Sequence, residues 1–147
     1  MTNEERLSGV FVPMVTPFRD EEINYEGLID NVKKLNKTGL TGYFVLGTNG
    51  EFKSLSVEER LKVTETVVKH AAADKIVMAG TAAESTKETI DITLEAAKLG
   101  VSQVSLLMPH FFRKYIDDEV LINYIIEVAE ASPVPVVLYN NPSVAAD

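Results

Sequence analysis

The sequence contains no cysteine, which excludes disulfide bonds, thiolate metal sites and a cysteine nucleophile. Basic residues are scarce: 14 lysines and arginines face 22 acidic residues, and the formal net charge is −8. Nucleic acid and anionic membranes require a positive field, so neither is an expected partner. No apolar run approaches the roughly 20 residues of a membrane span, and the polar start MTNEERLSG lacks the apolar segment of a signal peptide. We therefore expect a soluble, cytoplasmic protein.

Short apolar runs recur along the chain and predict strands, because each run is too short for a helix. The runs are Val10 to Val15, Gly42 to Leu46, Ile76 to Ala79, Val104 to Leu107 and Val134 to Tyr139. Helical periodicity fills the segments between them, with apolar or small residues at Val57, Leu61, Thr64 and Val68, and at Leu121, Tyr124, Ile125 and Val128.

Several residues mark the ends of the expected helices. Two capping boxes are expected, Ser56 with Glu59 and Ser85 with Glu88. C′ glycines are expected at Gly39 and Gly100. Three acidic pairs lie at or near expected helix starts, where capping by solvated carboxylates is favoured over metal binding. These pairs are Glu21-Glu22, Glu58-Glu59 and Asp117-Asp118.

Strands and helices alternate with about thirty residues per unit, the length of a right-handed parallel βαβ crossover. The pattern therefore predicts that the whole chain, residues 1–147, is α/β with a parallel sheet and no internal domain boundary. Two architectures fit this order: an open doubly wound sheet and a (β/α)₈ barrel. Length alone favours the open sheet, since a barrel needs roughly 250 residues.

The most informative segment is Tyr43 to Glu51, YFVLGTNGE. Four apolar residues suit a strand buried on both faces, and the glycines that follow permit close backbone approach. Thr48 and Asn49 add a hydroxyl, a carboxamide and backbone N–H groups at the strand's carboxyl end. Ligands of α/β proteins bind at such ends, so the turn predicts a carboxylate or phosphate site.

The fifth run also ends in polar residues, Tyr139-Asn140-Asn141-Pro142. A tyrosine there could transfer a proton, but its phenol, with a pKa near 10, is a weak base unless a second hydroxyl such as that of Thr48 assists it. The alternative is a core tyrosine whose hydroxyl is satisfied locally.

Five motifs then occur in a fixed order near predicted strand ends. They are Gly9 to Phe18 (GVFVPMVTPF), Gly47 to Glu51 (GTNGE), Ala79 to Thr81 followed by Ser85-Thr86, Pro109 to Phe112 (PHFF) and Tyr139 to Pro142 (YNNP). Over essentially the whole chain, they resemble the dihydrodipicolinate synthase and N-acetylneuraminate lyase family of pyruvate-dependent class I aldolases. The resemblance implies a (β/α)₈ TIM barrel, of which this chain holds about the first five strands and four helices, and so overrides the argument from length.

The resemblance further implies a homo-oligomer, dimer or tetramer, that joins pyruvate to an aldehyde or splits a 2-keto acid. No cofactor is implied beyond a covalent imine between pyruvate and a lysine, and no metal. By matching positions, Thr48 belongs to a hydroxyl relay, and Asn49 with the neighbouring N–H groups of the Gly47 to Gly50 turn holds the pyruvate carboxylate. Tyr139 protonates or deprotonates the intermediate. This assignment is chemically coherent, since the iminium is an electron sink whose carboxylate is anchored by donors.

The sequence departs from the family at the lysine. In the family the Schiff-base lysine lies on the sixth strand, and no predicted strand of this chain contains a lysine. Lys75 precedes the third strand, at the opposite end of the sheet, while Lys53 and Lys114 lie in polar loops. A loop lysine in water stays protonated. We therefore expect this chain alone to lack aldolase activity.

Three further departures concern the branch of the family. Asn49 stands where synthases carry a second threonine, Phe111 where many members donate a tyrosine across a dimer interface, and Val144 where true synthases have an arginine. A valine cannot replace a guanidinium that binds a carboxylate. These positions favour a non-synthase branch such as a 4-hydroxy-2-oxoglutarate aldolase, with a true 4-hydroxy-tetrahydrodipicolinate synthase of lysine biosynthesis as the alternative.

A pocket for the second substrate is expected around His110, Phe111 and Val144. No carboxylate lies near His110 in the sequence, which favours a surface loop histidine over a substrate contact. A hypothesis of another class is a truncated, non-catalytic homologue that binds pyruvate or modulates an oligomer. In either case five strands would leave two open edges, so we expect the isolated chain to associate.

Overall fold

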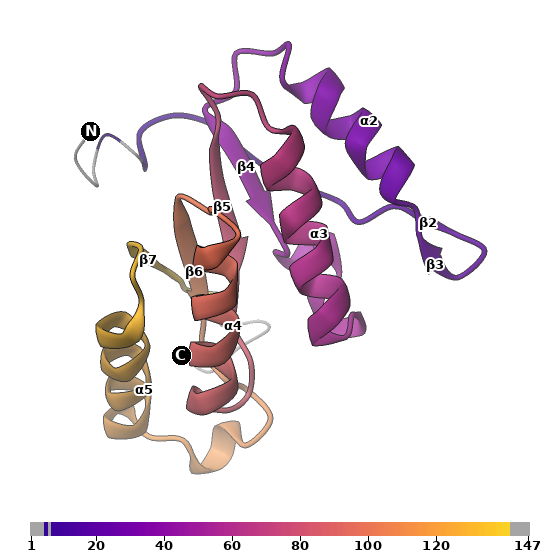
Figure 1. Ribbon diagram of the computed structural model, residues 1–147. Helices are drawn as coiled ribbons and strands as arrows, with labels where there is room; N and C mark the ends of the chain where they lie inside the picture. Colours follow the sequence, from indigo (N-terminus) through magenta and orange to yellow (C-terminus); the bar gives the residue numbers. More distant parts are fainter. Residues whose placement is uncertain (1–4, 6, 142–147) are drawn as a thin grey trace.

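The computed structural model describes residue 5 and residues 7–141, and its centre is a parallel five-stranded sheet in the order β1-β4-β5-β6-β7 (Figure 1). The strands are β1 (Phe11–Pro13), β4 (Gly42–Val45), β5 (Ile76–Gly80), β6 (Gln103–Leu107) and β7 (Val136–Tyr139). All five predicted strands are present, with ends that differ by up to two residues. The three central strands are almost fully buried, whereas β1 and β7 are only partly buried.

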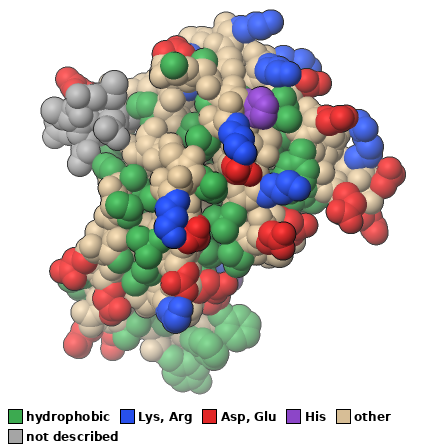
Figure 2. Space-filling model, viewed as in Figure 1, with side chains coloured by type: hydrophobic (Ala, Val, Ile, Leu, Met, Phe, Trp, Pro, Cys, Tyr) green, Lys and Arg blue, Asp and Glu red, His purple; other side chains and the backbone are tan. Residues whose placement is uncertain are grey.

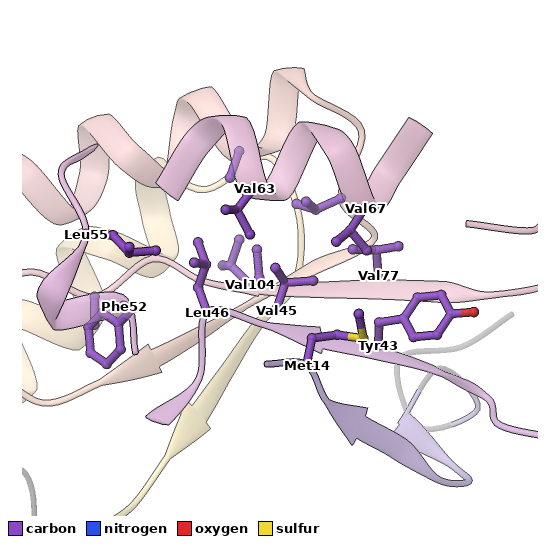
Figure 3. Packing of buried hydrophobic residues seen from close by; sticks show 14 of the residues in the cluster. Met14, Tyr43, Val45, Leu46, Phe52, Leu55, Val63, Val67, Val77 and Val104 are labelled. Carbon is purple, nitrogen blue, oxygen red and sulfur yellow. The ribbon is translucent and has the colours of Figure 1, made fainter. Parts of the chain in front are cut away.

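One layer of helices covers one face of the sheet, each helix contacting the next. The helices are α2 (Tyr25–Leu35), α3 (Val57–His70), α4 (Thr86–Lys98) and α5 (Asp118–Ala131). Figure 3 shows Val63 and Val67 on the side of α3 that faces the strands, above Val45 and Val77. On α3 the buried residues are Arg60, Val63, Thr64 and Val67. Of the four expected positions, Thr64 is buried and Val68 is partly buried against the core.

The capping predictions are confirmed in part. Ser56 and Glu59 form the complete box at the start of α3. At α4, Ser85 accepts the N–H of Glu88, and among the described residues only this half of the second box is formed. Gly100, with φ +96°, ends α4 in a Schellman motif, because its N–H reaches the Ala97 carbonyl and the N–H of Val101 reaches that of Ala96.

The prediction for Gly39 is wrong. Helix α2 ends at Leu35 with Asn36 as its C-cap, and Gly39 lies beyond it without a positive φ. Asn36 does more than end the helix. Its Oδ1 accepts the Tyr43 hydroxyl at 2.6 Å and the Ala72 N–H at 2.9 Å, and its Nδ2 donates to the His70 carbonyl at 2.8 Å. One side chain thus joins α2, the buried base of β4 and the end of α3.

A small antiparallel hairpin was not expected from the sequence. Strands β2 (Phe18–Arg19) and β3 (Glu22–Ile23) flank a two-residue turn in which Asp20 has φ +51° and Glu21 has φ +66°. A turn with two positive φ angles normally carries Asn-Gly or Asp-Gly, which explains why Asp-Glu gave no signal. The Glu21-Glu22 pair therefore belongs to the hairpin, and Asn24 is the N-cap of α2.

Candidate functional site

The turn after β4 forms a short 3₁₀ helix, η1 (Thr48–Gly50), at the carboxyl end of the sheet. The N–H groups of Gly50 and Glu51 bond back to the carbonyls of Gly47 and Thr48, at 3.0 and 3.1 Å. No side chain caps the start of η1, so the N–H groups of Thr48 and Asn49 have no partner among the described residues. They are available to an anion.

Neighbouring strands hold this turn in place from two sides. A Cβ added to Gly80 on β5 would lie 2.4 Å from the Leu46 carbonyl oxygen, so only glycine permits this approach. On the other side, Thr16 donates to the Gly50 carbonyl at 2.8 Å, and a Cβ on Gly50 would lie 3.2 Å from the Met14 carbonyl. The turn therefore cannot shift independently of the sheet.

Two non-glycine residues bracket the turn in the left-handed region: Leu46 with φ +61° and Glu51 with φ +54°. Each such residue costs on the order of 1–3 kcal/mol, and residues of this kind cluster at functional sites. The chain therefore reverses sharply at Leu46, directly before Gly47 and Thr48.

Tyr139, at the end of β7, lies on the same small cavity as Thr48 and Gly47. The cavity has a volume of about 10 Å³, room for one water molecule, and is also lined by Phe44, Leu46, Phe52, Gly80, Ala82, Ser105 and Leu107. The Tyr139 ring meets Phe44 edge to face at 5.9 Å, and its hydroxyl oxygen accepts the Asn141 side-chain amide at 3.2 Å. No direct bond joins Thr48 and Tyr139 in the part of the chain that the structure describes.

A larger pocket of about 420 Å³ opens beside this cavity and shares Thr48 with it. Its lining consists of Thr48, Glu51, Phe52, Lys53, Ser54, Leu107 and His110. Asn49 is exposed, and Thr48 is the member of the pair that lines both spaces. The structure therefore brings Thr48, Gly47, Tyr139 and His110 to one end of the sheet.

Glu84, in the loop after β5, organises the rim of the larger pocket and was missed in the sequence. Its Oε1 lies 2.5 Å from Lys53 Nζ and 2.7 Å from His110 Nδ1. Its Oε2 accepts the backbone N–H groups of His110 and Phe111 at 3.0 and 3.1 Å. His110 is an exposed loop histidine, as the sequence favours, but it does have a carboxylate partner in Glu84. The separation of 26 residues between Glu84 and His110 hid the pair.

The pKa of Glu84 reflects these contacts. Partial burial acts to raise it, but the hydrogen bonds from Lys53 and from the N–H groups of Phe111 and His110, together with the Lys53 charge, lower the pKa to about 2. Glu84 is thus an anion that joins three loops, those after β4, β5 and β6.

Arg60 packs against Phe52, one of the residues that line the larger pocket. It is 6% exposed, donates from Nη2 to the Ala82 carbonyl at 2.9 Å, and places its guanidinium carbon 5.3 Å from the centre of the Phe52 ring. Burial lowers its pKa, while Glu88 and Tyr124 act in the opposite direction. Its Nε is buried without a partner among the described residues. Periodicity hid this residue, because an arginine on a helix is usually interpreted as solvated.

No lysine lies on any strand that the structure describes. Lys53 is paired with Glu84, and Lys114 is exposed in η3 (Arg113–Tyr115). Lys75 lies at the amino end of β5, where Nζ donates to the carbonyls of Thr38 and Leu40 at 3.1 and 2.8 Å. Each position agrees with the prediction from the sequence.

The loop after β6 projects aromatic side chains into solvent. Phe111, Phe112 and Tyr115 are 74%, 63% and 85% exposed, and the two phenylalanine rings pack edge to face at 5.0 Å. Figure 2 shows hydrophobic side chains projecting at the end of the molecule where the orange segment lies in Figure 1. Phe111 is not among the described residues that line the larger pocket, and lines a separate hollow of about 290 Å³ with Phe112, Lys114 and Tyr115. Val144, the other predicted wall of the second-substrate pocket, lies outside the described residues.

A family model described as the dihydrodipicolinate synthetase family matches residues 6–146. The chain belongs to this family. A 4-hydroxy-tetrahydrodipicolinate synthase of Methanothrix thermoacetophila is 41% identical over 91% of this chain and 44% of its own length. A probable mitochondrial 4-hydroxy-2-oxoglutarate aldolase of Emericella nidulans is 35% identical over 99% of this chain and 49% of its own. This chain spans about half the length of the curated relatives it matches.

Solved structures of similar proteins share the fold of this chain. A Ruminococcus gnavus sialic acid aldolase, crystallised as a catalytic lysine mutant, matches with a TM-score of 0.89 and 31% identity over 99% of this chain and 48% of its own. A dihydrodipicolinate synthase of Acinetobacter baumannii, crystallised with pyruvate, matches with a TM-score of 0.86 and 32% identity over 92% and 46%. These relatives are TIM barrels, so the five strands correspond to part of a barrel, as predicted, and the open-sheet alternative is wrong. No described helix is long and apolar enough to cross a membrane.

Proposed function

We propose that this chain forms the pyruvate-binding part of a Schiff-base-forming aldolase or lyase. The observation that carries the proposal is the common cavity of Thr48, Gly47 and Tyr139 at the carboxyl ends of β4 and β7. Active sites of (β/α)₈ barrels lie at this end of the strands. The pyruvate bound to the Acinetobacter baumannii relative supports the choice of ligand.

In this proposal the N–H groups of Thr48 and Asn49 and the backbone from Gly47 to Gly50 hold the carboxylate of pyruvate. Donors fixed by the sheet need little reorganisation when an anion binds, which makes them effective for charge stabilisation. The Thr48 hydroxyl and one water molecule would link the substrate to Tyr139, whose phenol moves a proton at the carbon next to the imine. No metal or cofactor enters this chemistry.

The imine requires a lysine in an apolar site near the cavity. Lys53 and Lys114 do not meet this requirement, the first because it is 45% exposed and paired with the carboxylate of Glu84, and the second because it is exposed. We therefore propose that the 147 residues alone are inactive and that the lysine belongs to the part of the barrel represented in the relatives but not in this chain.

For the second substrate we propose an aldehyde bound near His110, Phe111 and Val144, and a branch other than dihydrodipicolinate synthesis, such as a 4-hydroxy-2-oxoglutarate aldolase. Asn49, Phe111 and Val144 support this choice, as does the Emericella nidulans relative. Synthase names among the other relatives support the alternative, a lysine-biosynthetic synthase. We further propose that the complete protein is a cytoplasmic homo-oligomer.

A direct test titrates pyruvate into ¹⁵N-labelled chain and follows amide shifts. We expect shifts at Thr48, Asn49 and Gly50 that saturate, and weaker binding by Asn49→Asp, which adds a charge that repels the carboxylate. Ser54→Asp, on the rim of the larger pocket, is the matched control for added charge. Acetone, which lacks the carboxylate, should cause no such shifts. Equal shifts with acetone and pyruvate would contradict the carboxylate site.

In a second test, the chain is mixed with pyruvate and treated with borohydride, and the mass of the chain is then measured. We expect no pyruvate adduct on this chain, because none of its lysines is both desolvated and close to the cavity. An adduct on Lys53 would overturn the argument. Saturable pyruvate binding without an adduct also fits the second candidate, a non-catalytic pyruvate-binding or oligomer-modulating homologue, which the lack of a lysine on the described strands favours.

A further inference from the structure

Three buried polar side chains lie behind the walls of the small cavity, one on each of the helices α3, α4 and α5. They are Arg60, Thr89 and Tyr124, which are 6%, 0% and 3% exposed. Polar side chains buried to this degree need hydrogen-bond partners. The partners of these three include backbone groups at the carboxyl ends of β5 and β6, where the candidate site lies.

Arg60 joins two walls of the cavity. Its Nη2 donates to the Ala82 carbonyl at 2.9 Å, and its guanidinium carbon lies 5.3 Å from the centre of the Phe52 ring. Ala82 and Phe52 both line the cavity that Thr48 and Tyr139 share. Helix α3 thereby ties the loop after β5 to the loop after β4.

Thr89 and Tyr124 form a second link. Thr89 Oγ1 accepts the N–H of Ala83 at 3.0 Å and lies 3.1 Å from the hydroxyl oxygen of Tyr124. That hydroxyl oxygen lies 3.4 Å from the carbonyl oxygen of Leu107, which lines both the small cavity and the larger pocket. Because Ala83 directly follows Ala82, the two links meet in the loop after β5.

We propose that Arg60, Thr89 and Tyr124 are positioning residues, which hold the walls of the pyruvate cavity in place without touching the ligand. The cavity has a volume of about 10 Å³, so a small displacement of its walls would expel the water molecule that links Thr48 to Tyr139. The identity of the ligand rests on the proposed function, whereas the placement of the walls does not.

A role in stability alone does not account for Arg60. A methionine would keep the packing against Phe52 and would remove a buried guanidinium whose Nε has no partner among the described residues. What methionine would lack is the bond to the Ala82 carbonyl, and that bond ends at a wall of the cavity.

The test compares two tyrosine-to-phenylalanine substitutions in the full 147-residue chain. Tyr124→Phe removes a hydroxyl beside the cavity wall. Tyr43→Phe removes one that donates to Asn36 Oδ1 at 2.6 Å, at the amino end of the sheet. Both tyrosines are buried, and Figure 3 shows Tyr43 and Phe52 at opposite ends of the labelled cluster. The two variants therefore lose the same group at similar burial and differ in its distance from the cavity.

We expect Tyr124→Phe to raise the Kd of pyruvate, measured from amide shifts, by about fivefold, since the wall loses roughly one ordinary hydrogen bond. Arg60→Met should act in the same direction. Tyr43→Phe should change the Kd by less than about twofold, although urea unfolding should show a comparable loss of stability. A Kd that rises equally in both tyrosine variants, or in neither, would overturn the inference.

Spectra recorded without ligand separate this inference from the proposed function. Tyr124→Phe and Arg60→Met should shift the amide signals of Gly47 and Thr48, which line the cavity but are not among the described partners of the three side chains. Tyr43→Phe should leave both signals in place. If the signals shift as expected and the wild type fails to bind pyruvate, the proposed function fails and the positioning role stands. Signals that stay in place in Tyr124→Phe and Arg60→Met would refute the positioning role, even if the wild type binds pyruvate.

Discussion

Oε1 of Glu84 lies 2.7 Å from Nδ1 of His110, and Oε2 of the same carboxylate accepts the N–H of His110. The two oxygens divide their contacts, because Oε1 meets the side chains of Lys53 and His110 while Oε2 meets backbone N–H groups only. The carboxylate thus fixes both the ring and the backbone of His110.

Glu84→Gln should loosen this contact and destabilise the chain by about 1 kcal/mol, since the carboxylate is partly exposed and its charge-assisted bonds are partly screened. Urea unfolding would measure the change. Glu95→Gln, in a surface pair with Lys98, is the control and should cost no more than about 0.5 kcal/mol. An equal effect of both substitutions would show that Glu84 is an ordinary surface carboxylate.

The same residue predicts a pH dependence. The pKa of Glu84 in the folded chain, about 2, lies below its ordinary value of 4.5. Its contribution is therefore fully present above pH ~5 and is lost as the pH falls through about 2, below which the carboxyl group is protonated in both folded and unfolded chains. The difference in unfolding free energy between the wild type and Glu84→Gln should shrink over this window. A difference that stays constant from about pH 6 to about pH 2 would refute the assignment.

Gly80→Ala should destabilise the chain by about 3 kcal/mol, because the new Cβ would lie 2.4 Å from the Leu46 carbonyl oxygen. That oxygen belongs to the backbone, so it cannot move aside as a flexible side chain could. Pyruvate binding should weaken as well, since the turn moves with Leu46. Gly39→Ala is the control: a Cβ added there would have nothing within 4 Å, so the substitution should be neutral or stabilise by up to about 1 kcal/mol. Thermal unfolding of the two variants tests this contrast.

Arg60→Met should cost less than about 1 kcal/mol, whereas Arg60→Ala should cost about 2–3 kcal/mol. Methionine keeps the packing against Phe52 and removes a guanidinium whose Nε is buried without a described partner. Alanine leaves a cavity beneath the pocket. Chemical denaturation of both variants decides the matter, and equal losses would show that the bond to Ala82 outweighs the packing.

The sequence predicted the parts of the fold that depend on neighbouring residues. Apolar runs identified all five strands, and the turn from Gly47 to Gly50 stands where an α/β sheet binds ligands. Local rules failed at the hairpin, because Asp20 and Glu21 adopt positive φ angles that their types rarely take. They failed at Gly39 because Asn36 ends the helix through contacts with Tyr43 and Ala72.

The site was harder to predict than the fold. Thr48 and Tyr139 were found because each lies where an apolar run ends. Glu84 was missed because its partners lie 31 residues before it and 26 after it, and no local pattern marks a carboxylate that binds distant loops. Arg60 was missed because its partner is the backbone carbonyl of Ala82. Every residue type carries such a carbonyl, so the residue at position 82 gives no signal of this bond.

The side chain of Asn36 binds three segments at the amino end of the sheet, the end remote from Thr48 and Tyr139. The contacts of Asn36 and the proposed binding turn thus lie at opposite ends of the same sheet. Substitutions in the loops after β4, β5 and β6 leave the Asn36 contacts untouched, so descendants of this sequence can acquire new specificities while the anchoring at the far end is inherited unchanged.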